Sequence, residues 1–129
     1  MKIALGLGCD RGTPATTIAR AVSEALADCG ATLADVHAVA SIDLKADEDG
    51  LLHFAAQHGW TIRFYSPPEL AAVAVPNPSE TVRKYTGTPS VSEAAALLGG
   101  GGSALLIEKH KARGPDGRNA TVSIARIAQ

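Results

Sequence analysis

Aromatic residues, cysteines and net charge are all scarce in this sequence. Phenylalanine, tryptophan and tyrosine make up 4% of its 129 residues, so the core must be aliphatic. The formal net charge of −1 gives no reason to expect a nucleic-acid partner or a charged membrane surface. Two cysteines, Cys9 and Cys29, are too few for the disulfide framework of a small secreted protein, and we expect both to be reduced.

Long apolar runs are also missing. No run approaches the roughly 20 residues that span a bilayer, and the first apolar stretch is too short for a signal peptide. Hydrophobic residues nevertheless make up 46% of the chain, which is enough to build a core. We therefore expect one cytoplasmic domain over residues 1–129.

Apolar runs alternate with helix signals along the chain. The runs predict strands at residues 2–8, 35–43, 60–66, 103–111 and 120–128, and the segments between them contain helical patterns. This alternation predicts an α/β fold, a three-layer α/β/α sandwich with a mixed, mostly parallel five-stranded sheet. The last strand should be antiparallel because its connection is too short for a crossover.

Helix starts are marked by small polar residues. Thr13 precedes Pro14 and should cap the first helix. The stretch "SPPE" opens a short helix with capping-box spacing, and Ser79 begins another. Ser90 and Glu93 have the same capping-box spacing ahead of "AAALL". Ser79, Ser90 and Glu93 therefore have a structural explanation, with contact to a ligand as the alternative.

The loop after the first strand, "GLGCDRGT", favours an anion site. Gly6, Gly8 and Gly12 permit close backbone approach or positive φ. Thr13 begins a helix whose free N–H groups attract anions, and the guanidinium of Arg11 suits a carboxylate. A tight strand-to-helix turn is the alternative. The loop has no Walker lysine, and its glycines are spaced one residue too far apart for a dinucleotide fingerprint.

Three further residues near this loop suggest chemistry. Cys9 lies at a helix head beside Arg11, which should lower the pKa of its thiol and favour a nucleophile. In "SIDLKADEDG", Lys45 could bind a carboxylate and Glu48 could orient it or move a proton. The plainer alternatives are a small buried cysteine and acidic residues that favour a helix N-terminus.

A basic cluster follows in the fourth strand. Lys109 and Lys111 project from one face of the strand, and Arg113 and Arg118 lie near the hairpin tip. In a nearly neutral protein such a cluster suggests an acidic small molecule, with a solvated hairpin tip as the alternative. The histidine spacing does not favour a metal site, and we expect no cofactor.

The motifs taken together resemble the CobE/CbiG C-terminal domain family of cobalamin biosynthesis. "GLGCDRGT", "SIDLKADEDGL", "PSETV", "SVSEAAALL" and "IEKHKA…ATVSIA" occur in the family's order over nearly the whole chain. The chain is most similar to the stand-alone CobE-like form. One departure is Cys9-Asp10-Arg11-Gly12, where the family often has Cys-Arg-Arg-Gly, and it leaves the charge of the loop to Arg11.

The resemblance implies a role in building the corrin ring of cobalamin. The expected ligand is a precorrin or hydrogenobyrinic-acid-type tetrapyrrole, a macrocycle edged with acetate and propionate groups, and other enzymes of the pathway are possible partners. The first hypothesis is an accessory protein of the aerobic pathway that binds an intermediate. The expected ligand-binding residues are Gly6, Gly8, Cys9, Arg11, Gly12, Thr13, Lys45, Glu48, Ser79, Ser90, Glu93 and Lys109.

Two other functions stay open. The resemblance also suggests a hydrolase or lyase, because CbiG proteins open a lactone on a cobalt-precorrin and expel acetaldehyde. Cys9, Lys45 and Glu48 would then be the catalytic candidates. The third possibility is an α/β protein that binds a phosphorylated metabolite at the first loop.

Overall fold

The computed structural model describes residues 1–102 and 104–127 and confirms the expected α/β class. In these described residues, five strands and five α-helices follow one another, with short 3-10 turns at Leu33–Asp35 and Asp43–Lys45. The strands are β1 (Ile3–Cys9), β2 (Val36–Ile42), β3 (Ile62–Tyr65), β4 (Leu105–Arg113) and β5 (Asn119–Arg126). The helices are α1 (Ala15–Asp28), α2 (Asp49–Gln57), α3 (Pro67–Ala71), α4 (Glu80–Thr86) and α5 (Val91–Gly99).

The strands form one mixed sheet in the order β3-β2-β1-β5-β4. β1, β2 and β3 are parallel, whereas β5 is antiparallel to both β1 and β4, as expected for the closing hairpin. β1 is therefore central and its first six residues are buried. The ends expected at residues 103 and 128 lie outside the described residues.

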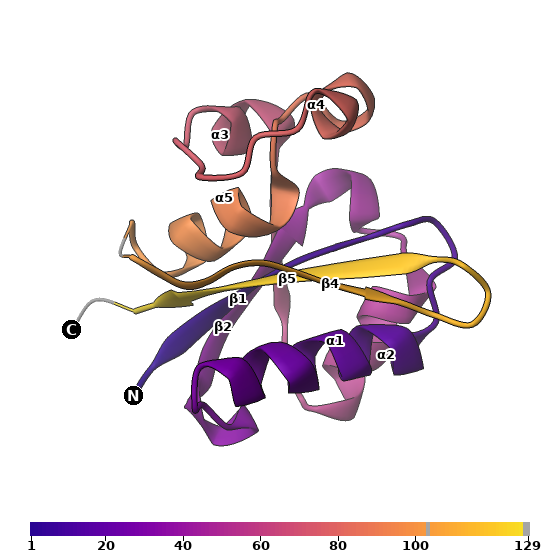
Figure 1. Ribbon diagram of the computed structural model, residues 1–129, viewed down its shortest axis with the longest axis vertical. Coiled ribbons are helices and arrows are strands. Elements are labelled where there is room, and N and C mark those ends of the chain that lie inside the picture. The colour runs from indigo at the N-terminus through magenta and orange to yellow at the C-terminus, as the bar shows by residue number, and fades with distance from the viewer. Residues whose placement is uncertain (103, 128–129) are drawn as a thin grey trace.

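Helices cover both faces of the sheet, which makes the three layers (Figure 1). α1 and α2 lie on one face, and α3, α4 and α5 lie on the other. The apolar stripe of α1, with Ile18, Val22 and Leu26, packs into the larger core cluster beside Leu5 and Phe54. The smaller cluster joins α3 and α5 to the ends of β2 and β3. The core is mainly aliphatic, as the composition predicts.

Gly6 allows α5 to lie directly against β1. A Cβ atom at Gly6 would stand 1.9 Å from the carbonyl oxygen of Ser92 and 2.5 Å from the backbone nitrogen of Ala96. Both are backbone atoms of α5, so neither can move aside like a side chain. The glycine therefore sets the distance between the central strand and this helix.

Two of the expected helix caps are wrong. The residue at the N-cap of α1 is Pro14, and the hydroxyl of Thr13 donates to the carbonyl oxygen of Asp10 at 2.7 Å instead. Ser90 is at the N-cap of α5 but its hydroxyl makes no cap hydrogen bond, and the side chain of Glu93 bonds to Asn77 instead of closing a capping box. The capping box of Ser66 and Glu69 on α3 is confirmed.

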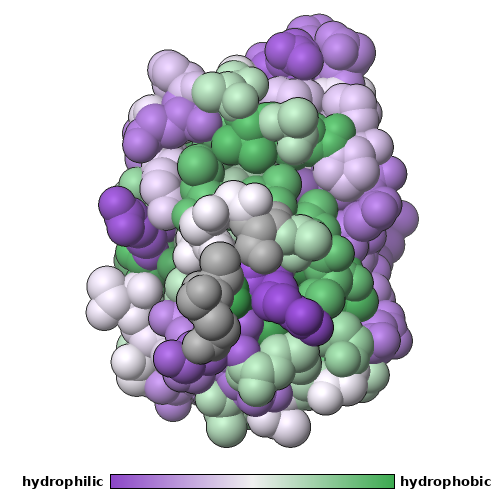
Figure 2. All heavy atoms as spheres, turned by 90° about the vertical axis from the view of Figure 1, so that its left-hand side faces the viewer, coloured by the Kyte–Doolittle hydropathy of each residue, from purple (hydrophilic) through white to green (hydrophobic). Residues whose placement is uncertain are grey.

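Figure 2 looks onto the end of the molecule where both termini lie. Hydrophobic residues reach the surface in the middle of this end, and hydrophilic residues gather at its top and sides. Among residues 1–102 and 104–127, no helix is both long enough and apolar enough to cross a membrane.

We expect Gly6→Ala to lower the free energy of unfolding by about 3 kcal/mol or more, because overpacking against a fixed backbone cannot relax cheaply. Gly99→Ala is the matched control on α5, the helix that packs against Gly6, since a Cβ at Gly99 would meet only ordinary contacts of 3.5 Å and beyond. That variant should be unchanged or more stable by up to about 1 kcal/mol. Urea denaturation measures both, and equal stabilities would contradict the close-packing account.

Candidate functional site

A cavity of about 700 Å³ opens where the C-terminal ends of β1 and β2 meet α4, α5 and the hairpin. Ligands commonly bind at this edge of a parallel sheet. The cavity is lined by Gly8, Cys9, Asp10, Arg11, Ile42, Leu44, Lys45, Ser79, Thr81, Val82, Tyr85, Thr86, Val91, Ser92, Lys109, Lys111, Asn119 and Thr121.

The structure brings half of the expected site residues into this cavity. Those that line it are Gly8, Cys9, Arg11, Lys45, Ser79 and Lys109. Gly6 lies under α5, and Thr13, Glu48, Ser90 and Glu93 are buried away from the cavity surface. Gly12 takes a positive φ of 79° beside Arg118, so its role in shaping the turn is confirmed.

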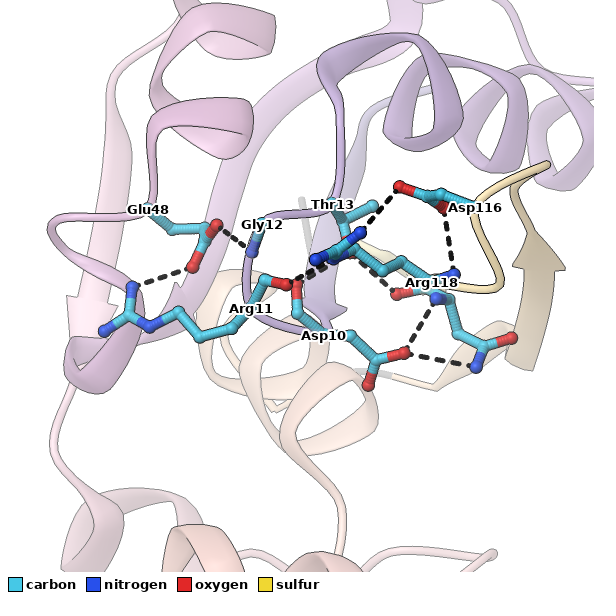
Figure 3. A network of polar contacts seen from close by, with 8 residues as sticks. Asp10, Arg11, Gly12, Thr13, Glu48, Asp116 and Arg118 are labelled. Atoms are coloured by element: carbon cyan, nitrogen blue, oxygen red, sulfur yellow. Dashed lines mark hydrogen bonds and ion pairs between the residues drawn. The ribbon is translucent and has the colours of Figure 1, made fainter.

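The protein places its own carboxylate on the opening loop (Figure 3). Glu48 accepts a hydrogen bond from the backbone N–H of Gly12 at 2.8 Å and another from the guanidinium of Arg11 at 2.7 Å. Arg11 also donates to Asp47 at 3.0 Å, and these two carboxylates raise the pKa of Arg11. The expected anion cradle exists, but the buried side chain of Glu48 occupies it.

Asp10 ties the same loop to the hairpin, at the position where the resembling family often has a second arginine. Its carboxylate accepts from the backbone N–H of Asn119 at 2.8 Å and from the amide nitrogen of that side chain at 3.2 Å. Arg118 donates to the carbonyl oxygen of Arg11 at 2.9 Å from the other side. Asp10 therefore adds no positive charge to the loop, and its hydrogen bonds connect the end of β1 to the start of β5.

The thiol of Cys9 is neutral, and the expectation of a lowered pKa is wrong. Burial raises the pKa of Cys9 to about 11, and the nearby charge of Lys45 only partly opposes this. The guanidinium of Arg11 points to Asp47 and Glu48, so it does not stabilise a thiolate. Cys9 can line a binding surface, but the geometry does not activate it as a nucleophile.

The free positive charge of the cavity comes from lysines on two walls. Lys45 follows β2, whereas Lys109 and Lys111 come from β4. Lys109 donates to the carbonyl oxygen of Asn77 at 3.2 Å. None of the three lysines takes part in an ion pair within the described part of the chain.

Two apolar side chains at the cavity are exposed, and the sequence reasoning missed them. Leu44 is 48% exposed and Tyr85 is 75% exposed. The missed signal for Tyr85 is helical spacing, since it lies four residues after Thr81 and three after Val82 on α4, and all three line the cavity. Leu44 directly precedes Lys45, so one short turn presents an apolar group and a cation together.

The structure shows no candidate metal site among residues 1–102 and 104–127. No group of three histidine, cysteine or acidic side chains is placed there to hold an ion. The arrangement instead offers lysine ammonium groups, hydroxyls and exposed apolar surface. Such a set suits a ligand that is both acidic and hydrophobic.

Comparisons with known proteins agree with one another. The model of the family described as cobalamin synthesis G C-terminus matches residues 3–125. A cobalt-precorrin-5A hydrolase from Priestia megaterium is 42% identical over 125 residues, which cover 97% of this chain and 32% of that protein. The chain thus spans about a third of the hydrolase.

Two relatives are closer to this chain in length. Protein CobE from a Sinorhizobium species is 43% identical over 107 residues, covering 81% of this chain and 70% of that protein. The crystal structure of CobE, a protein from the cobalamin (vitamin B12) biosynthetic pathway, superposes with a TM-score of 0.83 at 35% identity. That match covers 98% of this chain and 91% of the other.

Glu48→Gln should lower the free energy of unfolding by about 1–2 kcal/mol. Hydrogen bonds to charged groups contribute about 1.5–3 kcal/mol, and the value falls here because the side chain of Arg11 is 62% exposed. Asp47→Asn is the matched control, since Asp47 contacts the same guanidinium but is 79% exposed, and it should change stability less. Thermal and urea unfolding report the order of the two variants, and the reverse order would contradict the cradle.

The raised pKa of Cys9 predicts slow alkylation at neutral pH. In a Cys29→Ser background, only about one thousandth of Cys9 is thiolate at pH 8, because that pH lies three units below a pKa of about 11. The rate of reaction with iodoacetamide should therefore rise about tenfold per pH unit from pH 7 to pH 10. Mass spectrometry measures the rate of alkylation. A rate that stops rising by pH 9 would contradict the raised pKa of Cys9 and show that the thiol is activated.

Proposed function

The chain belongs to the cobalamin synthesis G C-terminus family of cobalamin biosynthesis proteins, and on this premise we propose that it is a tetrapyrrole-binding accessory protein of that pathway. The proposed ligand is a precorrin or hydrogenobyrinic-acid-type intermediate. Such molecules combine a broad hydrophobic ring with carboxylates at its edge. The proposed site is the cavity of about 700 Å³ at the ends of β1 and β2.

One observation carries this proposal: cations on two walls of the cavity lie beside exposed apolar side chains. Lys45 stands on one side and Lys109 and Lys111 stand on the other, so carboxylates at separate edges of a ring each have an ammonium partner. Leu44 and Tyr85 offer apolar surface to the ring itself. Arg11, which the sequence favoured, is a weaker contact because Asp47 and Glu48 already hold it.

The relation to the hydrolase supports a second candidate function, the opening of a precorrin lactone. The hydrolase shares 42% identity with this chain, but the chain spans 32% of its length. The neutral thiol of Cys9 favours binding over nucleophilic catalysis, which would need Lys45 or Glu48 to act instead. We therefore rank the accessory role first.

Several sequence expectations stay predictions beside this proposal. They are that residues 1–129 work as one domain, that the protein is cytoplasmic, and that it meets other enzymes of the pathway.

Lysine substitutions test the proposed site. Titration with cobyrinic acid, followed by absorbance, should give a Kd that rises about fivefold in each of Lys45→Ala, Lys109→Ala and Lys111→Ala. This corresponds to about 1 kcal/mol for one partly exposed ion pair. Lys2→Ala, outside the cavity, is the matched control and should bind like the wild type.

A comparison of two pigments separates the contribution of the ligand's carboxylate charges from that of its ring. Cobinamide has the same ring with amide side chains, so it should bind at least tenfold more weakly than cobyrinic acid. Equal binding of both pigments would refute the carboxylate contacts.

Mass spectrometry of precorrin intermediates incubated with the protein tests the alternative function, the opening of a lactone. A mass change with the wild type that is lost in Lys45→Ala or Glu48→Gln would establish catalysis.

A further inference from the structure

The helix α4 forms one wall of the cavity but is only lightly built into the fold. Thr81, Val82 and Tyr85 of this helix line the cavity, yet no residue of α4 is buried. Figure 1 shows α4 farther from the sheet than α5. Prolines 76 and 78 precede the helix, and Gly87 ends it with a φ of 79°. Val82 packs against the smaller core cluster, and the backbone N–H of Ser79 donates to the carbonyl oxygen of Pro89 at 2.8 Å, so further polar contacts must add to this sparse packing to hold the wall in place.

Asn77, just before α4, makes the connections that core packing does not. Its backbone N–H donates to Glu93 at 3.2 Å, and its side-chain amide donates to Glu93 at 2.7 Å and to Glu108 at 3.0 Å. Its carbonyl oxygen accepts from Lys109 at 3.2 Å. One residue thus joins the segment before α4 to both α5 and β4. The cap residue Ser79 follows two positions later.

Glu93 makes this anchor strong because its carboxylate is fully buried. Among residues 1–102 and 104–127, no lysine, arginine or histidine lies within 4.0 Å of it. The backbone N–H and the side-chain amide of Asn77 donate hydrogen bonds to the two oxygens of this buried carboxyl group. A buried carboxylate that loses its donors is costly, so Glu93 strongly favours the state in which Asn77 is docked.

Lys109 belongs to both the anchor and the cavity. An ammonium group has three donors, and the contact with Asn77 uses one of them. Two donors remain for a carboxylate in the cavity. A bound carboxylate would therefore be tied through Lys109 to the residue that holds α4.

We propose that Asn77 is a positioning residue, which holds α4 as a wall of the binding cavity and links it through Lys109 to the carboxylate of the bound ligand. The link to a ligand carboxylate rests on the proposed function, whereas the docking of α4 by Asn77 does not depend on it. Binding should then stiffen α4, because the ligand reinforces the contact between Lys109 and Asn77. Sequence spacing did not indicate this role, because it paired Glu93 with Ser90 in a capping box.

Hydrogen exchange of the protein without ligand tests the anchor. In Asn77→Ala, the amides of residues 80–87 should exchange at least tenfold faster than in the wild type, whereas those of β1 should not change. Glu108→Ala removes one exposed contact of the anchor and should give a smaller increase in the same amides. The Glu108→Ala variant still tests the anchor if Asn77→Ala does not fold. Glu69→Ala is the matched control, because it removes a side-chain bond to the backbone on α3, outside the cavity.

The same variants are then titrated with cobyrinic acid. We expect the Kd to rise at least fivefold in Asn77→Ala and to be unchanged in Glu69→Ala, and we expect the pigment to slow exchange in residues 80–87 of the wild type. Unchanged exchange in Asn77→Ala, or faster exchange with an unchanged Kd, would overturn the proposal. If the wild type does not bind the pigment while Asn77→Ala still loosens α4, the proposed function fails and the anchor stands.

Discussion

The approach of α5 to β1 is the constraint on which the cavity depends. Only a residue without a side chain fits at Gly6, where the helix backbone lies against the central strand. Because β1 is the central strand, the position of α5 also fixes where its first turn meets the ends of β1 and β2. Val91 and Ser92 of that turn line the cavity. The close contact at Gly6 and the smaller core cluster thus position α5 on the sheet, and the cavity lies at the edge of this layer.

Charge compensation within the fold decides which groups remain for a ligand. The opening loop has the glycines, the helix start and the arginine of an anion site, but Glu48 and Asp47 already use Arg11. Buried Glu93 accepts its hydrogen bonds from Asn77 and forms no ion pair with the described residues 1–102 and 104–127. Consequently the lysines of the cavity keep their charge available. Arg11 thus serves internal order, and the proposed binding of carboxylates falls to the ammonium groups of the lysines.

Family membership and the geometry of the cavity support different parts of the proposed function. Membership in the family shows that the chain is a cobalamin biosynthesis protein. The cavity adds the specific proposal that carboxylates are read by lysines while Leu44 and Tyr85 face the ring. The neutral thiol of Cys9 favours a carrier over a covalent catalyst. The chain spans only a third of the related hydrolase, so that protein's activity is not carried over to this chain.

The sequence by itself determined the class of fold, the strand and helix order and the antiparallel hairpin, because periodicity and turn residues act locally. Loops at the C-terminal ends of parallel strands converge, so the sequence also predicted that Lys45 lies near the loop of Cys9 and Arg11, whereas Lys109 reaches the same cavity from the antiparallel strand β4. Only the tertiary structure decided the partners of Arg11, Glu48 and Glu93, because each is joined to residues distant along the chain. The same holds for Cys9, whose pKa is set by burial rather than by its neighbours in sequence. Local spacing therefore predicted where polar groups gather, and three-dimensional packing decided which of them are already satisfied.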